Sequence, residues 1–357
     1  MTFLIHIGWF VRFLFPCLTL LLLLRVHPST ALVLWPPWRG WEQLRHIGPW
    51  GLLRYPSTTT QWFPGSRPFV LYLDDDDDDS SNASDGSTAK TTTKLVPLSS
   101  LPTYNTTTHR RIVALSDTHG NHRFYTAAIP PCDVLLHCGD ILQRYGYLGK
   151  VGGGRTVLAD FAAWLRTDVP QASYKVVVGG NHDALLQSMG KEAVQTFLRH
   201  YAGDSVVYLE HEMAHVADLV VFGSPWSPMG KTSNTAFQSG QNAQPLVDQA
   251  LQNSDNSKSD REVLAQQQQV DILMTHATCL AWEPLIQAKQ VQLWVHGHWH
   301  DGRGRIQQIP LSRQSRDTPC AISINVASND MIYRPIHPPV VYDVPLRSRK
   351  GSAGSTR

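Results

Sequence analysis

The sequence contains few cysteines, and none are spaced as a metal-binding pair. Five cysteines occur in 357 residues without any Cys-x-x-Cys motif, which excludes a disulfide scaffold. Cys132 and Cys138 flank a predicted strand, and we expect ordinary buried thiols there. The alternative is that these two cysteines form a disulfide bridge or bind a metal.

A charge excess of either sign is also missing. The chain has 31 Lys and Arg residues against 29 Asp and Glu residues, a formal net charge of +2. This balance gives no global signature of nucleic-acid binding, although a local basic patch stays open, and we expect no specific nucleic-acid partner. The hydrophobic share of 42% is sufficient for a sizeable core.

The N-terminal region lacks acidic residues before Glu42 and contains a hydrophobic run instead. Phe13–Leu24 is apolar apart from Thr19, and Ser29-Thr30-Ala31 supplies the small residues typical of a signal-peptide cleavage site. We therefore predict a signal peptide over 1–31. This places the protein in the secretory pathway, secreted or membrane-anchored.

Two alternatives stay open for this leader. Phe3–Leu24 is long enough for an uncleaved signal anchor, and hence for membrane association. Against this, Arg12 within a span would cost about 2.5–3.5 kcal/mol. A basic, acid-poor N-terminus is also typical of organellar targeting peptides.

Residues 32–108 are predicted to be a low-complexity extension. The segment 32–68 contains five of the eleven tryptophans, and it either lies on a membrane or on the folded domain, or is poorly ordered. Asp74–Asp79 is an acidic run followed by a Ser/Thr-rich stretch, which is typical of a solvated linker. The sequons at Asn82 and Asn105 agree with glycosylation of a secreted chain.

From Arg111 short β-branched runs alternate with helical segments, which predicts an α/β domain over 109–346. A polar excursion interrupts it at about 230–269, and 347–357 is predicted to be a disordered basic tail. The predicted strands are 112–116, 134–137, 174–178, 206–209, 219–222, 272–275, 293–295, 321–326 and 339–344. The predicted helices are 156–167, 191–200 and 245–251.

Metal-binding residue types follow five of these strands, so that five strand ends carry donors to one place. Each group is weak by itself, because Asp-x-His or Gly-Asp occurs often by chance, whereas all five in this register are specific. The mixture of oxygen and nitrogen donors suits two divalent ions such as manganese, iron or zinc better than calcium. The residues are Asp117, His119, Asp140, Asn181, His182, Asp183, His276, His298 and His300.

Three further histidines lie close to these motifs. His137 and His296 sit one step inside a predicted strand, and we expect core histidines that support the ligands. His122 belongs to a second Gly-Asn-His sequence that does not follow a strand. We expect His122 on the surface.

These motifs together resemble the calcineurin-like metallophosphoesterases, from Arg111 to Val344. Within that superfamily the chain is most similar to the metallophosphoesterase domain-containing (UPF0046-type) proteins, in the segments Ser116–His119, Leu135–Asp140, Gly223–Pro228 and Ile272–His276. The resemblance implies an α/β fold in which a β-sandwich is flanked by helices, in four α/β/β/α layers.

The resemblance also implies roles for individual residues. One metal would be held by Asp117, His119, Asp140 and His300, and the second by Asp140, Asn181, His276 and His298. His182 would be the catalytic histidine that binds no metal, and we expect Asp183 to orient it. Some members have glycine at the position of His298, so the full ligand set predicts an intact second site.

The same inferences predict a two-metal hydrolase of phosphoric esters, acting through a metal-bridging hydroxide. A phosphodiesterase for small phosphodiesters, with cyclic nucleotides among the candidates, is the expected activity. A phosphomonoesterase or protein phosphatase of the same fold, and a non-catalytic metal-binding scaffold, are the alternatives. Trp226 is a candidate for stacking on a nucleobase, against the alternative that it packs into the core.

Overall fold

The structure is a computed structural model that describes residues 69–76, 90–143, 153–230, 234–238, 243–252, 269–312 and 319–347. The predicted signal peptide, the Trp-rich segment 32–68, the sequon at Asn82 and all but the first residue of the C-terminal tail lie outside these residues. Within the described ranges, no helix has the length and apolar character needed to span a membrane.

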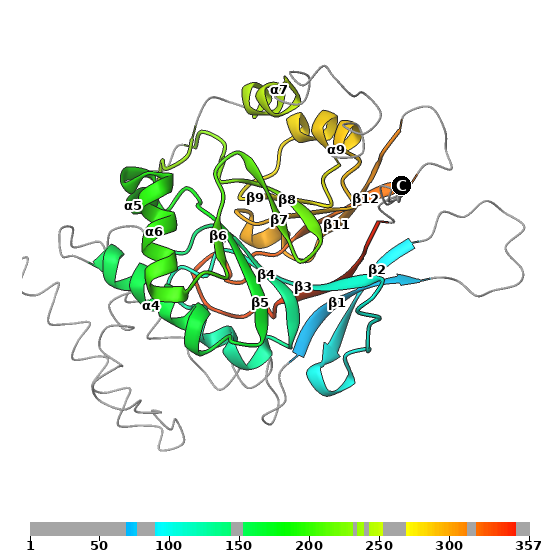
Figure 1. Cartoon of the computed structure of the whole chain (residues 1–357), viewed down its shortest axis with the longest axis horizontal. Helices are drawn as coiled ribbons and strands as arrows, with labels where there is room; N and C mark the ends of the chain where they lie inside the picture. The colour runs from blue at the N-terminus through cyan, green and yellow to red at the C-terminus, as the bar shows by residue number, and fades with distance from the viewer. Residues whose placement is uncertain are drawn as a thin grey trace, which may run out of the picture. The chain divides into compact units, whose positions relative to one another are not determined.

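Two β-sheets form the centre of the domain (Figure 1). The seven-stranded sheet has the order β2-β1-β13-β3-β4-β5-β6, and the six-stranded sheet has the order β11-β12-β10-β9-β8-β7. The strands of the first sheet are β1 (Phe69–Asp76), β2 (Lys90–Pro97), β3 (His109–Leu115), β4 (Cys132–Cys138), β5 (Ala172–Val178), β6 (Val206–Tyr208) and β13 (Val340–Pro345). Those of the second are β7 (Glu212–Val216), β8 (Leu219–Ser224), β9 (Ile272–Thr275), β10 (Leu293–His296), β11 (Ile306–Pro310) and β12 (Cys320–Asn325).

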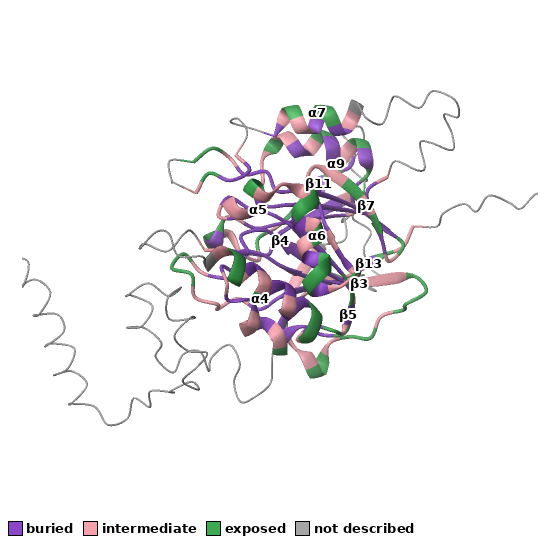
Figure 2. Cartoon of the chain, turned by 60° about the vertical axis from the view of Figure 1, so that its left-hand side comes forward, coloured by how far each residue is buried: buried purple, intermediate pink, exposed green. Residues whose placement is uncertain are grey.

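Helices cover the outer faces of both sheets. The first sheet is covered by α4 (Gly153–Thr167), α5 (Ala184–Met189), α6 (Lys191–Ala202) and the 3-10 helix η3 (His122–Ala128). The second is covered by α7 (Gln244–Gln252), α9 (Glu283–Lys289) and the 3-10 helix η4 (Leu280–Trp282). Figure 2 shows buried strands between helices that are exposed on their outer sides. The predicted α/β sandwich with four layers is confirmed.

The side-chain period of two explains how one strand serves two layers. In β3, Val113 and Leu115 pack with the helices, whereas Ile112 and Ala114 pack against the second sheet. In α4, apolar residues at helical spacing such as Phe161 and Leu165 face the first sheet, as the sequence predicted. The core therefore fixes each strand against a slip of one residue.

The domain begins earlier than predicted. Strands β1 and β2 pair antiparallel along their whole length, from Phe69 with Pro97 to Asp76 with Lys90, and β1 pairs parallel with β13. The prediction of a low-complexity extension over 32–108 is therefore wrong for these two segments. The acidic and threonine-rich composition concealed buried Val70 and Leu73, and Thr91–Thr93 are β-branched residues that suit a strand.

Parallel pairing brings the strand ends together. Strands β3, β4 and β5 are parallel in the first sheet, and β8, β9 and β10 are parallel in the second. Since neighbouring parallel strands end at the same sheet edge, the loops that follow them lie close together. The predicted metal-binding residues come from these loops.

Candidate metal centre

The loops after β3, β4, β5, β9 and β10 bring all seven predicted metal ligands and His182 into one cluster. Potential ligand atoms of Asp117, His119 and His300 lie within 4.8 Å of one another. The same limit holds for Asp117, Asp140 and His276, and for His119, Asp140 and His182. Asp117, His119 and Asp140 each belong to two of these three groups, so the groups form one continuous cluster.

The backbone at this cluster adopts unusual conformations. Asp117, His119, Asp140 and His298 have φ values of 55°, 45°, 53° and 66°. Positive φ is uncommon for residues with a side chain, and such conformations concentrate at functional sites because the surrounding structure must hold them. Four of the seven predicted ligands thus depend on a tightly constrained backbone.

Two motif glycines allow the ligand loops to approach each other. A Cβ on Gly180 would lie 2.3 Å from Asp140 Oδ1 and 2.7 Å from a ring carbon of His276. A Cβ on Gly297 would lie 2.0 Å from Ser116 Oγ and 2.2 Å from Asp117 Oδ2. Glycine at these positions is a steric requirement of the metal centre.

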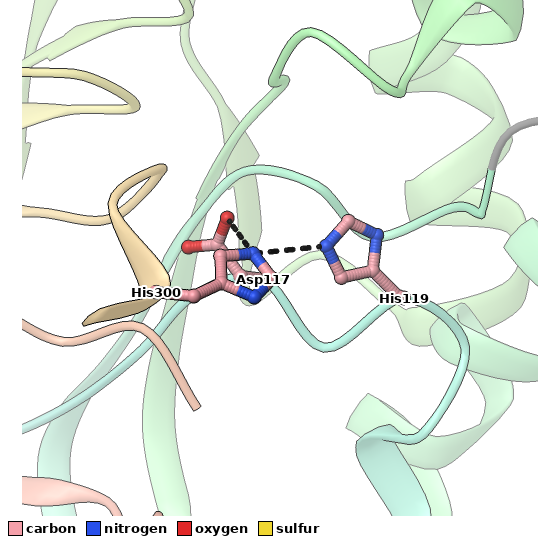
Figure 3. A group of neighbouring side chains, drawn as sticks. All are labelled: Asp117, His119 and His300. Carbon is pink, nitrogen blue, oxygen red and sulfur yellow. Dashed lines mark hydrogen bonds and ion pairs between the residues drawn. The ribbon is translucent and has the colours of Figure 1, made fainter. Parts of the chain in front are cut away.

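The first predicted metal position is formed by three loops, and Figure 3 shows its residues Asp117, His119 and His300. His300 Nε2 lies 3.2 Å from Asp117 Oδ1 and 3.4 Å from His119 Nε2, and His119 Nε2 lies 3.8 Å from Asp140 Oδ2. Asp117 Oδ1 is buried and has no hydrogen-bond partner within the described structure. A buried carboxylate oxygen surrounded by imidazole nitrogens is a suitable cation ligand.

The second predicted position surrounds the amide oxygen of Asn181. Asn181 Oδ1 lies 3.0 Å from His276 Nε2 and 2.9 Å from His298 Nδ1. His276 Nε2 also lies 3.4 Å from Asp140 Oδ2. The structure thus brings together the four residues predicted for this position.

Three of the histidines have their rings fixed by backbone carbonyl groups. The Nδ1 atoms of His119, His276 and His300 lie 3.1, 2.8 and 2.7 Å from the carbonyl oxygens of Leu142, Cys138 and Asp330. A carbonyl only accepts hydrogen bonds, so each Nδ1 carries the proton and each Nε2 faces the carboxylates. Metal-binding histidines are commonly oriented by such bonds to the ring nitrogen that binds no metal.

The charges of the cluster also favour a cation. Burial would lower the pKa of His276 and His300, but Asp140 and Asp117 outweigh it and raise both pKa values to about 9. The pKa of Asp117 lies below its usual range, because the interaction with His300 outweighs burial. Protons on two histidines therefore balance two buried carboxylates, and divalent metals would replace those protons. The residues fit a metal centre.

His182 lies at the edge of the cluster, where its ring contacts the polar excursion. Its Nε2 is 2.9 Å from the Asn234 amide nitrogen and 3.8 Å from Asp140 Oδ2, and its backbone N–H donates to Asp140 Oδ1 at 2.8 Å. Burial lowers the pKa of His182. Asn234 was missed by the sequence analysis, because a polar, low-complexity surrounding gave it no signal.

Asp183 does not orient His182, which corrects the prediction. Its carboxylate accepts backbone N–H bonds from Leu142 at 2.8 Å, Gly180 at 2.9 Å and Ile141 at 3.2 Å. In the described part of the chain, no bond joins this carboxylate to the His182 ring. Asp183 instead ties the loop after β5 to the loop of Asp140. Burial and the Asp140 charge raise its pKa to about 7.

The prediction that Trp226 stacks on a nucleobase is also wrong. Its side chain is fully buried on the outer face of the second sheet, where the ring meets Trp282 edge-on at a centroid distance of 6.5 Å. The alternative, a core tryptophan, is confirmed.

The predictions for three further histidines and two cysteines can also be compared with the structure. His137 and His296 are buried and lie 2.9 and 3.2 Å from the hydroxyl oxygens of Thr118 and Ser323, as expected for supporting histidines. His122 is buried and not on the surface, since its Nε2 contacts Asp160 at 3.1 Å. Cys132 and Cys138 are free buried thiols.

The segment 329–337 was missed as part of the site. The Tyr333 ring lies against His119 at a centroid distance of 4.5 Å and against His300 at 5.8 Å. Tyr333 also has a positive φ, 63°, and Asn121 Nδ2 donates to its carbonyl oxygen at 3.1 Å. Asp330 and His337 in this segment do not directly follow a predicted strand, so the pattern that revealed the other site residues gave no signal here.

The family model for calcineurin-like phosphoesterases matches residues 110–302, more than half of the 357-residue chain. The chain belongs to this family. The family typically binds two divalent metals, and the His/Asp groups described above are able to hold a metal.

Similar proteins agree with this membership. Metallophosphoesterase domain-containing protein 1 of Homo sapiens is 25% identical over 276 residues, covering 66% of this chain and 72% of the human protein. A UPF0046 protein of Caenorhabditis elegans is 29% identical over 161 residues, covering 39% of this chain and 37% of that protein. These matches support the predicted subfamily.

Two further similarities are more distant. A probable rhamnogalacturonate lyase C of Emericella nidulans is 26% identical over 209 residues, covering 55% of this chain and 17% of that protein. The chain thus spans only 17% and 37% of two of its curated relatives. The crystal structure of TT1561 of Thermus thermophilus has a TM-score of 0.41 and 12% identity, covering 67% of this chain and all of that one.

Proposed function

We propose that this chain is a metal-dependent phosphoesterase, and more specifically a phosphodiesterase that hydrolyses small phosphodiesters, with cyclic nucleotides among the substrates to be tested. The observation that carries the proposal is the cluster itself, in which His182 stands beside the shared carboxylate Asp140. Protein serine/threonine phosphatases have the pattern Gly-Asp-x-x-Asp-Arg-Gly, whereas residues 139–145 of this chain read Gly-Asp-Ile-Leu-Gln-Arg-Tyr, and this departure favours a small substrate. Exposed Trp299 and Tyr333 beside the centre offer apolar surface for an ester substituent.

The proposed ligands divide into two sets that share Asp140. Asp117, His119 and His300 would complete one set, and Asn181, His276 and His298 the other. When bound, divalent metals act as Lewis acids on the phosphate oxygens and lower the pKa of water. Manganese, iron and zinc all suit these donors.

His182 is the proposed proton donor to the leaving oxygen. Its Nε2 lies at the margin of the cluster, 3.8 Å from Asp140 Oδ2, where a bound phosphate ester would meet it. The Asn234 amide nitrogen, at 2.9 Å, donates to this Nε2, and burial lowers the pKa of His182. The ring therefore takes up the proton that it donates only when an anionic ester displaces the amide. A positioned acid of this kind typically accelerates a reaction by about 10²–10⁴-fold.

The decisive experiment separates proton donation from metal binding at His182, because geometry alone admits both. We expect His182→Ala to lower kcat on bis(p-nitrophenyl) phosphate by at least ~10²-fold while the metal content of the protein stays unchanged. Asn234→Ala should lower kcat less, by roughly two- to tenfold, the scale of one hydrogen bond. Exposed His200→Ala serves as the control.

Several outcomes contradict the proposal. Loss of metal in His182→Ala would make His182 a ligand. A higher kcat/KM on p-nitrophenyl phosphate than on the diester, with manganese, iron or zinc, would make the chain a monoesterase. No hydrolysis of either ester by metal-loaded protein would favour a scaffold.

A further inference from the structure

A cavity of about 470 Å³ adjoins the metal centre. The proposed ligand His300 is one of its lining residues. Its other lining residues include Arg303, Met331, Ile332, Arg334 and Ile336.

One wall of the cavity is anchored to the metal centre. The Asp330 carbonyl accepts from His300 Nδ1 at 2.7 Å, and its carboxylate accepts from the backbone N–H groups of Ile332 at 3.0 Å and Arg334 at 2.8 Å. Arg334 Nε donates to the same carboxylate at 2.6 Å. The wall is therefore preformed and keeps its position relative to His300.

The surface of this wall is apolar and exposed. Met331 and Ile332 have 67% and 50% of their area accessible, although both belong to a segment that is firmly bonded at its base. Ile336 adds a third aliphatic side chain to the lining. Such a surface favours an aromatic or aliphatic body over a fully polar one.

The cavity lining contains two arginines, Arg303 and Arg334, and two aspartates, Asp301 and Asp330. Arg334 is paired with Asp330, whereas no carboxylate among the described residues forms an ion pair with Arg303, whose Nη2 donates to the Pro338 carbonyl at 2.5 Å. The acidic residue Asp301 is exposed at the rim, where water screens it. Burial and Arg303 lower the pKa of His337 to about 4, so this neighbour is neutral at pH 7.

We propose that the cavity binds the ester substituent that stays on phosphorus, and that it selects a substituent with an anionic group on an apolar body. Arg303 binds the anion, since a guanidinium group forms paired hydrogen bonds with carboxylate or phosphate. Met331, Ile332 and Ile336 contact the body. The inference rests on the proposed phosphodiesterase activity, which it makes more specific.

Three diesters test this selection in the metal-loaded full chain. All share p-nitrophenol as the leaving group, and the second arm is phenyl, 4-carboxyphenyl or 4-(aminomethyl)phenyl. We expect kcat/KM to be roughly ten- to hundredfold higher for the carboxyphenyl than for the phenyl ester, the scale of a charged hydrogen bond. The aminomethyl ester should be the slowest.

Variants of Arg303 identify the group responsible. Arg303→Met should bring the carboxyphenyl to phenyl ratio close to one, and Arg303→Lys should keep part of the preference. Exposed Arg305→Met, on the same segment, should keep the wild-type ratio. Thermal unfolding establishes that each variant is folded. If Arg303→Met does not fold, the carboxyphenyl to phenyl ratio of the wild-type protein still tests the preference for an anionic substituent.

The outcomes separate this inference from the proposed function. Hydrolysis of all three esters at equal rates, or an unchanged ratio in Arg303→Met, overturns the anion subsite and leaves the phosphodiesterase intact. Failure to hydrolyse any diester with any of the three metals overturns the phosphodiesterase itself.

Discussion

The metal centre and the cavity beside it are built by opposite means. In the centre, polar side chains such as Asp117, His119 and His276 are fully buried, and backbone groups fix their orientation. In the cavity, apolar Met331 and Ile332 are exposed, whereas the Asp330 carboxylate of the same wall is bonded to backbone N–H groups of its own segment.

This difference suggests separate roles, in which the metal centre carries out hydrolysis and the cavity determines which substituent is accepted. Ligand positions tolerate little displacement, because three of the four ligand rings donate to a backbone carbonyl on one side and would bind a metal on the other. The cavity wall contacts only the substituent, so its side chains can change without moving a ligand. We expect substitutions in the centre to abolish activity and substitutions in the wall to redirect it.

The largest effect should come from a single methyl group in the centre. In Gly297→Ala the new Cβ would lie 2.0 Å from Ser116 Oγ and 2.2 Å from Asp117 Oδ2, so the carboxylate must move. We expect metal affinity to fall by about 10–100-fold, as for other displaced supports of metal ligands, and hydrolysis to fall with it. Metal titration followed by activity measurement tests this.

Gly302→Ala is the matched control, since its Cβ would meet no atom closer than 3.4 Å. It should bind metal and hydrolyse esters like the parent chain. Equal metal affinity of the two variants would contradict the steric role of Gly297. A cost in stability of about 1–3 kcal/mol, typical of overpacking, is expected only for Gly297→Ala.

A moderate effect should appear in the pH dependence of metal binding. Since the pKa values of His276 and His300 are raised to about 9 in the metal-free protein, both are protonated at pH 7. Filling both metal positions should then release about two protons, and affinity should rise with pH up to about 9. Calorimetry in buffers of different ionisation enthalpy measures the release.

His300→Gln sharpens the same measurement, because it removes one of the two protonated rings. The release should fall to about one proton for that variant. Metal uptake without proton release at pH 7 would show that the buried carboxylates are balanced in another way.

The sequence was sufficient for the centre because donors directly follow strands. Once the parallel strands are placed, the positions of Asp140 and His276 follow from the strand ends. The apolar runs that mark these strands are buried on both faces and are therefore easily recognised. The layers and most strands were predictable for the same reason.

The remaining parts could not be predicted, for identifiable physical reasons. Strand β2 is polar because it lies at the edge of the sheet, where part of it faces solvent, and the acidic residues of β1, its neighbour, concealed that strand. Arg303 and Asn234 act through long-range contacts that no local pattern encodes. Asp183 was assigned from its neighbour in the sequence, whereas its bonds reach the loop of Asp140.

Substitution of Trp226 should have the smallest effect on activity, because this residue lies outside both the metal centre and the cavity. The ring packs with Trp282 in the layer outside the second sheet, so it contacts neither the metals nor the cavity. Trp226→Ala should destabilise the fold by about 3–5 kcal/mol, measured by urea unfolding. The kcat/KM ratio for carboxyphenyl and phenyl esters should stay unchanged per folded molecule, because no wall of the cavity moves. A changed ratio in folded protein would show that the helical layer outside the second sheet also shapes the substrate site. Substrate preference would then depend on that layer as well as on the cavity wall.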